Sequence, residues 1–174
     1  MKQVYYVPMS SREKHIEDSI NEAIGTFERA YKVEWLTNLI KAPDDSKFML
    51  VFERTDGAGS NSPAIGVKVI QGSQNKLTTE NMLNNAFKEL ELDEDKNFIS
   101  LFHPAEFVYI ILYENKAGTF PRVKIVPNPV DPKEGSRHMT MMLNILDEDE
   151  DWGLQPYDSF MLDKTSMIIL FAEE

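Results

Sequence analysis

The sequence has no cysteine, only three histidines among its 174 residues, and no long uninterrupted apolar run. The absence of cysteine excludes disulfide bonds, thiolate zinc sites, iron–sulfur clusters and a cysteine nucleophile. The longest apolar runs, residues 107–113 and 167–172, are seven and six residues long, whereas a membrane-spanning helix needs about 20. The first residues also lack the apolar segment and cleavage site of a secretory signal. We therefore expect a cytoplasmic protein without a membrane-spanning segment.

Catalytic motifs are also absent. The histidines (His15, His103 and His138) lie far apart, and neither a His-Glu-x-x-His pattern nor a Gly-x-Ser-x-Gly elbow occurs. Residues 56–62 form a Gly/Ser-rich loop after a predicted strand, but Pro63 and a second strand follow it instead of a phosphate-binding helix. We therefore predict no cofactor, no metal site and no catalytic residue. A small hydrolase or nucleotide-binding enzyme that uses this loop and His103 remains one alternative.

One acidic segment resembles the start of a calcium-binding loop. Asp147, Asp149 and Asp151 match the first three acidic positions of an EF-hand. The required glycine comes one place late, at Gly153, and the position of the bidentate glutamate holds Asp158. A strand is expected next, whereas an EF-hand needs a helix there. The segment is therefore expected to be a solvated acidic loop.

The pattern of apolar residues predicts an α+β fold in a single domain of residues 1–174. Strands are expected at residues 2–7, 47–54, 64–71, 107–114, 120–126, 159–162 and 166–172. Loops rich in turn residues predict three hairpins, formed by the second with the third strand, the fourth with the fifth and the sixth with the seventh. The sheet is thus expected to be largely antiparallel, with two or three helices packed on it. No internal repeat is apparent.

Two helices are predicted from helical spacing of apolar residues. The first follows a capping-box pattern, with serine before Glu13, and its apolar stripe continues beyond Tyr31 to Ala42. The second begins at Thr78 or Thr79 and ends near residue 90. Residues 137–146 are ambiguous between helix and strand, and their polar stripe favours a helix.

Negative charge is concentrated in two segments. The chain has a net charge of −11, yet residues 139–174 alone hold nine acidic residues against one lysine. A second acidic group lies at residues 89–95. Such a chain is not expected to bind nucleic acid through phosphate contacts. Aromatic residues within an acidic surface are typical of binding hot spots. We therefore assign partner binding to Asp147, Glu148, Asp149, Glu150, Asp151, Trp152, Tyr157, Glu91, Asp93, Glu94 and Asp95.

These observations predict a non-enzymatic interaction protein of the inhibitor, immunity or anti-defence type. Its partner is expected to be a basic protein, such as a nuclease, a toxin or a nucleic-acid-binding protein, because complementary charge speeds association. An alternative is a structural subunit of a larger assembly such as a phage particle. The sequence leaves the oligomeric state open.

Overall fold

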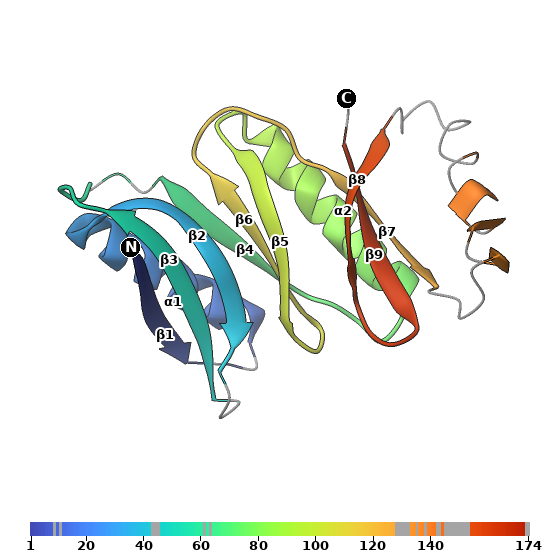
Figure 1. Cartoon of the computed structure of the whole chain (residues 1–174), viewed down its shortest axis with the longest axis horizontal. Coiled ribbons are helices and arrows are strands. Elements are labelled where there is room, and N and C mark those ends of the chain that lie inside the picture. The colour runs from blue at the N-terminus through green and yellow to red at the C-terminus, as the bar shows by residue number, and fades with distance from the viewer. Residues whose placement is uncertain are drawn as a thin grey trace. The chain divides into compact units, whose positions relative to one another are not determined.

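The computed structural model describes residues 1–8, 10, 12–42, 46–60, 62, 64–127, 133–134, 136–137, 139–141, 144 and 154–172. These residues form an α+β fold with two substantial helices and three antiparallel sheets of three strands each (Figure 1). The chain divides into two compact units, Met1–Gln74 with Leu90–Thr119, and Asn75–Glu89 with Phe120–Glu174. No described helix is long and apolar enough to cross a membrane. The predicted α+β class and the antiparallel strands are confirmed.

The elements follow a regular order along the chain. They are β1 (Lys2–Pro8), α1 (Glu13–Ala30), β2 (Lys32–Lys41), β3 (Lys47–Thr55), β4 (Ile65–Gln71), α2 (Lys76–Leu92), β5 (Asn97–Ala105), β6 (Val108–Glu114), β7 (Arg122–Pro127), β8 (Gln155–Met161) and β9 (Ser166–Ala172). The described residues among 133–144 are helical and separate β7 from β8. The strand orders in the three sheets are β1-β3-β2, β4-β6-β5 and β7-β9-β8. The chain is therefore three successive β-α-β-β repeats, each of which forms its own sheet.

Strand irregularities recur at equivalent places in the three repeats. In each repeat, the strand that follows the helix (β2, β5 or β8) leaves one residue unpaired after its second paired residue. This register shift lies between Val33 and Trp35 in β2, Phe98 and Ser100 in β5, and Pro156 and Asp158 in β8. The first pair after the shift is made with a residue of the central strand, which is Glu53 in β3, Leu112 in β6 and Leu170 in β9. On the opposite side, these central residues pair with Lys2, Val67 and Val123. Lys2, Val67 and Val123 thus occupy equivalent positions.

The expectation that the chain has no internal repeat is wrong. The repetition lies in strand order, hydrogen-bond register and bulges, while equivalent side chains differ, as Lys2 and Val67 do. Connections between equivalent elements also differ in length: β3 and β4 are separated by residues 56–64, whereas β6 and β7 are separated by residues 115–121. A search of the sequence for identical residues at a fixed spacing therefore does not detect this structural repeat.

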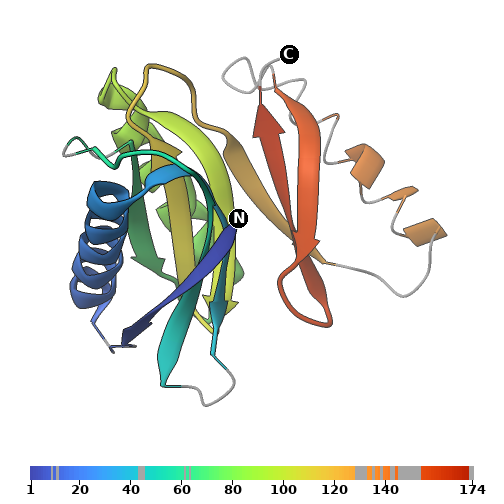
Figure 2. The same cartoon turned by 60° about the vertical axis from the view of Figure 1, so that its left-hand side comes forward.

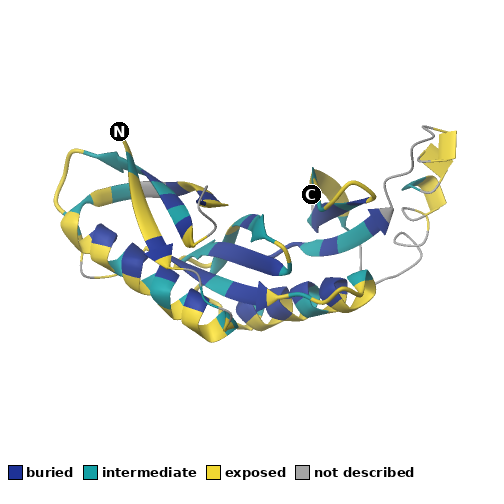
Figure 3. Ribbon diagram, turned by 90° about the horizontal axis from the view of Figure 1, so that it is seen from below, coloured by how far each residue is buried: buried dark blue, intermediate teal, exposed yellow. Residues whose placement is uncertain are grey.

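The helix α1 was predicted correctly over most of its length. Its apolar stripe is buried, as the two-coloured helix in Figure 3 shows, and belongs to the core cluster that also contains Phe48, Leu50 and Phe52 of β3. The predicted capping box is wrong, because Arg12 occupies the N-cap position and makes no side-chain cap bond. Ser10 instead accepts a hydrogen bond from the N–H of Arg12 at 3.2 Å.

The predicted continuation of the apolar stripe beyond Tyr31 is a strand, β2, rather than helix. The Tyr31 backbone is extended (φ −138°, ψ 153°), and its N–H closes the helix on Phe27. Leu36 and Leu39 are both buried although they are three residues apart, because a register shift between Leu36 and Asn38 restores the same face. A bulge inserts one extra residue and so changes the apparent period. The resulting spacing resembles that of a helix.

Two of the three predicted hairpins are wrong, because their strands pair elsewhere. β3 pairs with β1 and β2, whereas β4 pairs with β6. β6 also pairs with β5, and β7 pairs with β9. The strand β5 was not predicted, since two register shifts interrupt its alternation. The closing hairpin of β8 and β9, orange to red in Figure 2, is confirmed.

The second helix, α2, begins earlier than the sequence suggested. The Asn75 side chain accepts a hydrogen bond from the N–H of Thr78 at 3.0 Å, so Asn75 provides the cap that was assigned to Thr78 or Thr79. Leu83, Phe87 and the other predicted apolar positions are largely buried. The helix favoured for residues 137–146 is supported by the described residues of that range, all of which are helical.

Phe27 provides a direct test of the packing of α1. Its ring is 3% exposed and stacks on Phe52 with a centroid distance of 4.3 Å. Phe27→Ala removes this contact and leaves a cavity, so we expect the free energy of unfolding to fall by about 3–5 kcal/mol. Chemical denaturation monitored by circular dichroism measures the loss. An unchanged midpoint would contradict the assignment of Phe27 to the core.

Candidate functional site

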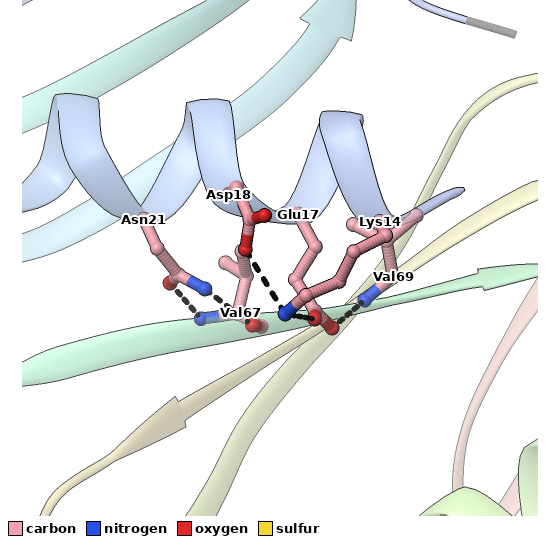
Figure 4. Close-up of polar contacts among 6 residues, drawn as sticks. All are labelled: Lys14, Glu17, Asp18, Asn21, Val67 and Val69. Carbon is pink, nitrogen blue, oxygen red and sulfur yellow. Dashed lines mark hydrogen bonds and ion pairs between the residues drawn. The ribbon is translucent and has the colours of Figure 1, made fainter. Parts of the chain in front are cut away.

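Polar side chains of α1 bind the outer backbone edge of β4 (Figure 4). Asn21 donates from Nδ2 to the carbonyl oxygen of Val67 at 3.0 Å and accepts from the Val67 N–H at 2.8 Å. Glu17 accepts from the N–H of Val69 at 2.9 Å. β4 is an edge strand of its sheet. The helix therefore satisfies backbone groups that would otherwise bond a neighbouring strand or water.

The match between helix and strand has a geometric basis. Four helical residues advance about 6.0 Å, and two strand residues advance about 6.6 Å. Side chains four residues apart on α1 thus meet alternate N–H groups of β4. Glu13 continues this spacing and accepts from the Gln71 N–H at 3.1 Å. Glu28, seven residues after Asn21, lies outside the spacing of four and accepts from the Ala64 and Ile65 N–H groups at 3.0 and 3.3 Å.

The second repeat uses the same device. Asn84 of α2 makes the same pair of hydrogen bonds with Val123 of β7, at 3.0 and 2.8 Å. Glu80 accepts from the N–H of Ile125 at 2.9 Å and pairs with Lys124 at 3.1 Å. We refer to Glu17, Asn21, Glu80 and Asn84 as the edge-sealing residues. Each pair connects a helix to the first strand of the following repeat.

This arrangement divides the acidic residues into two groups. The carboxylates of Glu13, Glu17, Glu28 and Glu80 bind backbone N–H groups and are part of the fold. Sequence reasoning missed them because it treated acidic residues only as surface charge. One signal was present: a Glu-x-x-x-Asn sequence occurs within a helix at residues 17–21 and again at 80–84, although it also occurs in β2 at residues 34–38. Only the remaining acidic residues are candidates for partner binding.

Four predicted partner-binding residues lie at the end of α2 and in the turn that follows. Asp93, Glu94 and Asp95 are exposed, and Glu91 is half-buried. Asp93 pairs with Lys96, and this hydrogen bond raises the pKa of the lysine. The last turn of α2 contains no basic residue, although a helix C-terminus favours positive charge. The negative charge here therefore does not stabilise the helix.

Tyr157 lies at the bulge of β8, which is an edge strand of its sheet. The bulge leaves Tyr157 without a partner on β9, and its side chain is 53% exposed. It borders a hollow of about 390 Å³ that is also lined by Met139, Pro156, Asp158, Ser159, Met167 and Ile169. Partial burial raises the pKa of Tyr157 to about 12, with a further contribution from the charge of Asp158. The phenol therefore stays neutral at physiological pH.

The other predicted contact residues lie outside the described part of the chain. These are Asp147, Glu148, Asp149, Glu150, Asp151 and Trp152. Glu91, Asp93, Glu94 and Asp95 belong to the first compact unit, and Tyr157 belongs to the second. The structure thus defines two separate candidate surfaces, one in each unit.

The loop and the histidine considered for enzymatic roles have structural contacts. Ser60 donates its N–H to the carbonyl oxygen of Glu28 at 2.8 Å, which holds the loop against the end of α1. A side chain at Gly59 would collide with the backbone of Glu28 and Arg29. His103 contacts the carbonyl oxygen of Val108 through Nδ1 at 2.9 Å and stacks on the Tyr109 ring. Within the described residues, no group of three His, Asp or Glu side chains could hold a metal ion.

Comparison with known proteins gave no similarity: no protein-family model, no curated protein and no solved structure matches this chain.

Glu28 provides a pH-dependent test of the contacts between α1 and β4. Its side chain is buried, and this burial raises its pKa above the ordinary 4.5 despite two backbone hydrogen bonds. The folded state thus holds the proton more tightly than the unfolded chain does. The resulting stabilisation is fully present below about pH 4.5 and is lost as the pH rises through the raised pKa.

As the pH rises from 4.5, we expect the free energy of unfolding of the wild type to fall relative to that of the Glu28→Gln variant. Urea denaturation across this range measures the difference. Glu22→Gln removes one exposed carboxylate from the same helix and serves as the control. A difference that grows in favour of the wild type with rising pH would contradict the assignment.

Proposed function

We propose that this chain is a non-enzymatic interaction protein, of the inhibitor or immunity type, that binds a basic protein surface in the cytoplasm. The observation that supports this most is the exposed Tyr157 beside Asp158, above the partly apolar hollow of the second unit. We refer to Tyr157, Asp158 and the hollow as the β8 site. The basic surface belongs to a nuclease, a toxin or a nucleic-acid-binding protein.

The β8 site has the chemistry needed to bind an arginine side chain. A guanidinium stacks favourably on an aromatic face such as that of Tyr157. One oxygen of Asp158 accepts from the N–H of Ser159 at 2.8 Å, and the second oxygen has no hydrogen-bond partner among the described residues, so it can pair with the cation. The aliphatic stem of arginine can pack on Met139 and Met167, which line the hollow.

The surrounding charge favours association with a basic partner. The five consecutive acidic residues 147–151 precede β8 closely in the sequence. Exposed charges attract a partner over about one Debye length, roughly 8 Å at physiological ionic strength. They therefore act mainly on the association rate, whereas buried contacts such as those at Tyr157 determine dissociation. The exposed Asp93, Glu94 and Asp95 add a second negative surface.

Tyr157→Ala is expected to weaken binding of an arginine-rich peptide by about fivefold, because it removes the cation–π contact. Fluorescence anisotropy of a labelled nona-arginine peptide measures the affinity. Tyr6→Ala is the matched control, because Tyr6 is also 53% exposed but lies on β1, outside the β8 site. Equal losses in the two variants would argue against specific recognition at Tyr157.

Neutralising Asp147, Glu148, Asp149, Glu150 and Asp151 to the corresponding amides should lower the association rate and reduce its salt dependence. Folding stability should stay the same or rise, because closely spaced like charges repel one another. Stopped-flow binding of the same peptide at low and high salt measures both effects.

The control variant for this prediction neutralises five exposed acidic residues elsewhere: Asp18, Glu22, Asp56, Glu106 and Glu134. It changes the net charge by the same amount and leaves residues 147–151 intact. If both variants lose the same association rate, only the total charge matters. The assignment of the interaction to residues 147–151 would then be wrong.

A further inference from the structure

Among the residues that the structure describes, no helix seals the outer edge of β1 as α1 and α2 seal its equivalents β4 and β7. Asn21 binds the N–H and carbonyl of Val67, and Asn84 binds those of Val123. The equivalent residue of the first repeat is Lys2. By the same register, Val4 corresponds to Val69, whose N–H is bound by Glu17. The free edge of β1 is thus the position at which an edge-sealing helix is found in the other two repeats.

The backbone groups along this edge are open to a partner. Met1 accepts from the N–H of Arg54 on β3, so in the alternating register Lys2, Val4 and Tyr6 direct their backbone groups away from β3. Within the described part of the chain, no side chain hydrogen-bonds these outward groups. β1 is also largely exposed, as its yellow ribbon at the N-terminus in Figure 3 shows. An open edge of this kind is a template for association.

The sheet face beside this edge is also uncovered and partly apolar. In the second repeat, Val69 and Ile110 belong to the core cluster of α1 and are at most 1% exposed. Their equivalents in the first repeat are Val4, which is 44% exposed, and its cross-strand partner Val51, which is half-buried. Tyr6, on the same face, is 53% exposed. The face that α1 covers in one repeat therefore has no described cover in the other.

The charge of this sheet identifies the class of helix that would fit. By the register of β1 and β3, Lys2 and Lys47 lie on this face together with one acidic residue, Glu53, in a chain whose net charge is −11. Lys2 stands where the second repeat has Val67, and Lys47 lies over the Tyr6 ring, 6.0 Å from its centroid. Positive charge on an otherwise acidic protein complements an acidic helix.

We propose that β1 and the adjacent face of its sheet bind an acidic amphipathic helix of a partner protein, which presents Glu and Asn four residues apart. The asparagine binds the backbone of Lys2, and the glutamate binds the N–H of Val4. The apolar side of the helix covers Val4, Val51 and Tyr6. This surface belongs to the first unit and is distinct from the β8 site, so the inference does not depend on the proposed function.

A second copy of this chain is a poorer occupant. In the third helical segment, residues 133–144, no glutamate lies four residues before an asparagine, because Glu134 is followed by His138 and Asn144 is preceded by Thr140. The Thr140 hydroxyl donates to the carbonyl of Ser136 at 2.8 Å within its own segment. That segment therefore lacks the Glu-x-x-x-Asn pair which the edge of β1 requires.

The test supplies such a helix in cis. A second copy of residues 10–31 is fused to the N-terminus of the full chain through a flexible Gly/Ser linker, which gives a high effective concentration. The control fusion contains Glu17→Ala and Asn21→Ala in the added copy only. Hydrogen exchange of the Val4 amide is measured by NMR in both proteins. We expect exchange to be about fivefold or more slower in the first fusion, as one net hydrogen bond implies.

Two results would overturn the proposal. The first is equal exchange at Val4 in the two fusions, because edge sealing would then not occur at β1. The second is reversible self-association of the unfused chain in sedimentation experiments that Val4→Lys abolishes, because a second copy would then cover the edge. A monomeric unfused chain together with slower exchange in the first fusion supports a partner helix.

Discussion

Each sheet that the structure describes has three strands, so the backbone groups on the outer edge of its first strand have no neighbouring strand to bond. In β4 and β7 they are bound by glutamate and asparagine side chains from the helix of the preceding repeat. Asn21 and Asn84 act as both donor and acceptor, and so replace the paired bonds of a neighbouring strand. The similar advance of four helical and two strand residues makes this possible without a further strand. This constraint fixes the direction and register of each helix on the strand that it seals.

The same constraint changes how the negative charge should be interpreted. Glu13, Glu17, Glu28 and Glu80 count toward a net charge of −11, yet their carboxylates bind backbone N–H groups. Burial even raises the pKa of Glu28, so ionisation of this side chain lowers the stability of the folded state. The total charge is therefore a poor measure of a partner-binding surface. The position of an acidic residue, on a sealed edge or on a free turn, separates its structural use from its availability to a partner.

Periodicity predicted most of α1 and α2, the strands β1, β3, β4, β6, β7 and β9, and the β8–β9 hairpin. It failed where bulges change the period: the spacing of Leu36 and Leu39 imitates a helix, and two register shifts hid β5. Hairpins were assigned to neighbours in sequence, but β3 and β4 belong to different sheets, since β4 begins a new repeat. For the candidate site, Tyr157 was proposed from its acidic context, but the sequence reveals neither its exposure nor the bulge at which it lies. The edge-sealing residues were missed because their partners are backbone groups far away in the sequence.

The two ends of the repeat series differ in a way that the edge constraint explains. A helix can seal a following strand only if its side chains reach across to the backbone, which Glu and Asn do in α1 and α2. In residues 133–144, Thr140 stands four residues before Asn144 where a glutamate would be needed, and its hydroxyl bonds within its own segment. The third helical segment therefore lacks the pair of side chains that seals β4 and β7. At the other end, β1 keeps the outward backbone groups of an internal strand, and neither a bulge nor a central proline interrupts its seven pairs with β3. The third helical segment thus lacks the side chains that would seal a strand, whereas β1 has the backbone groups that such side chains bind.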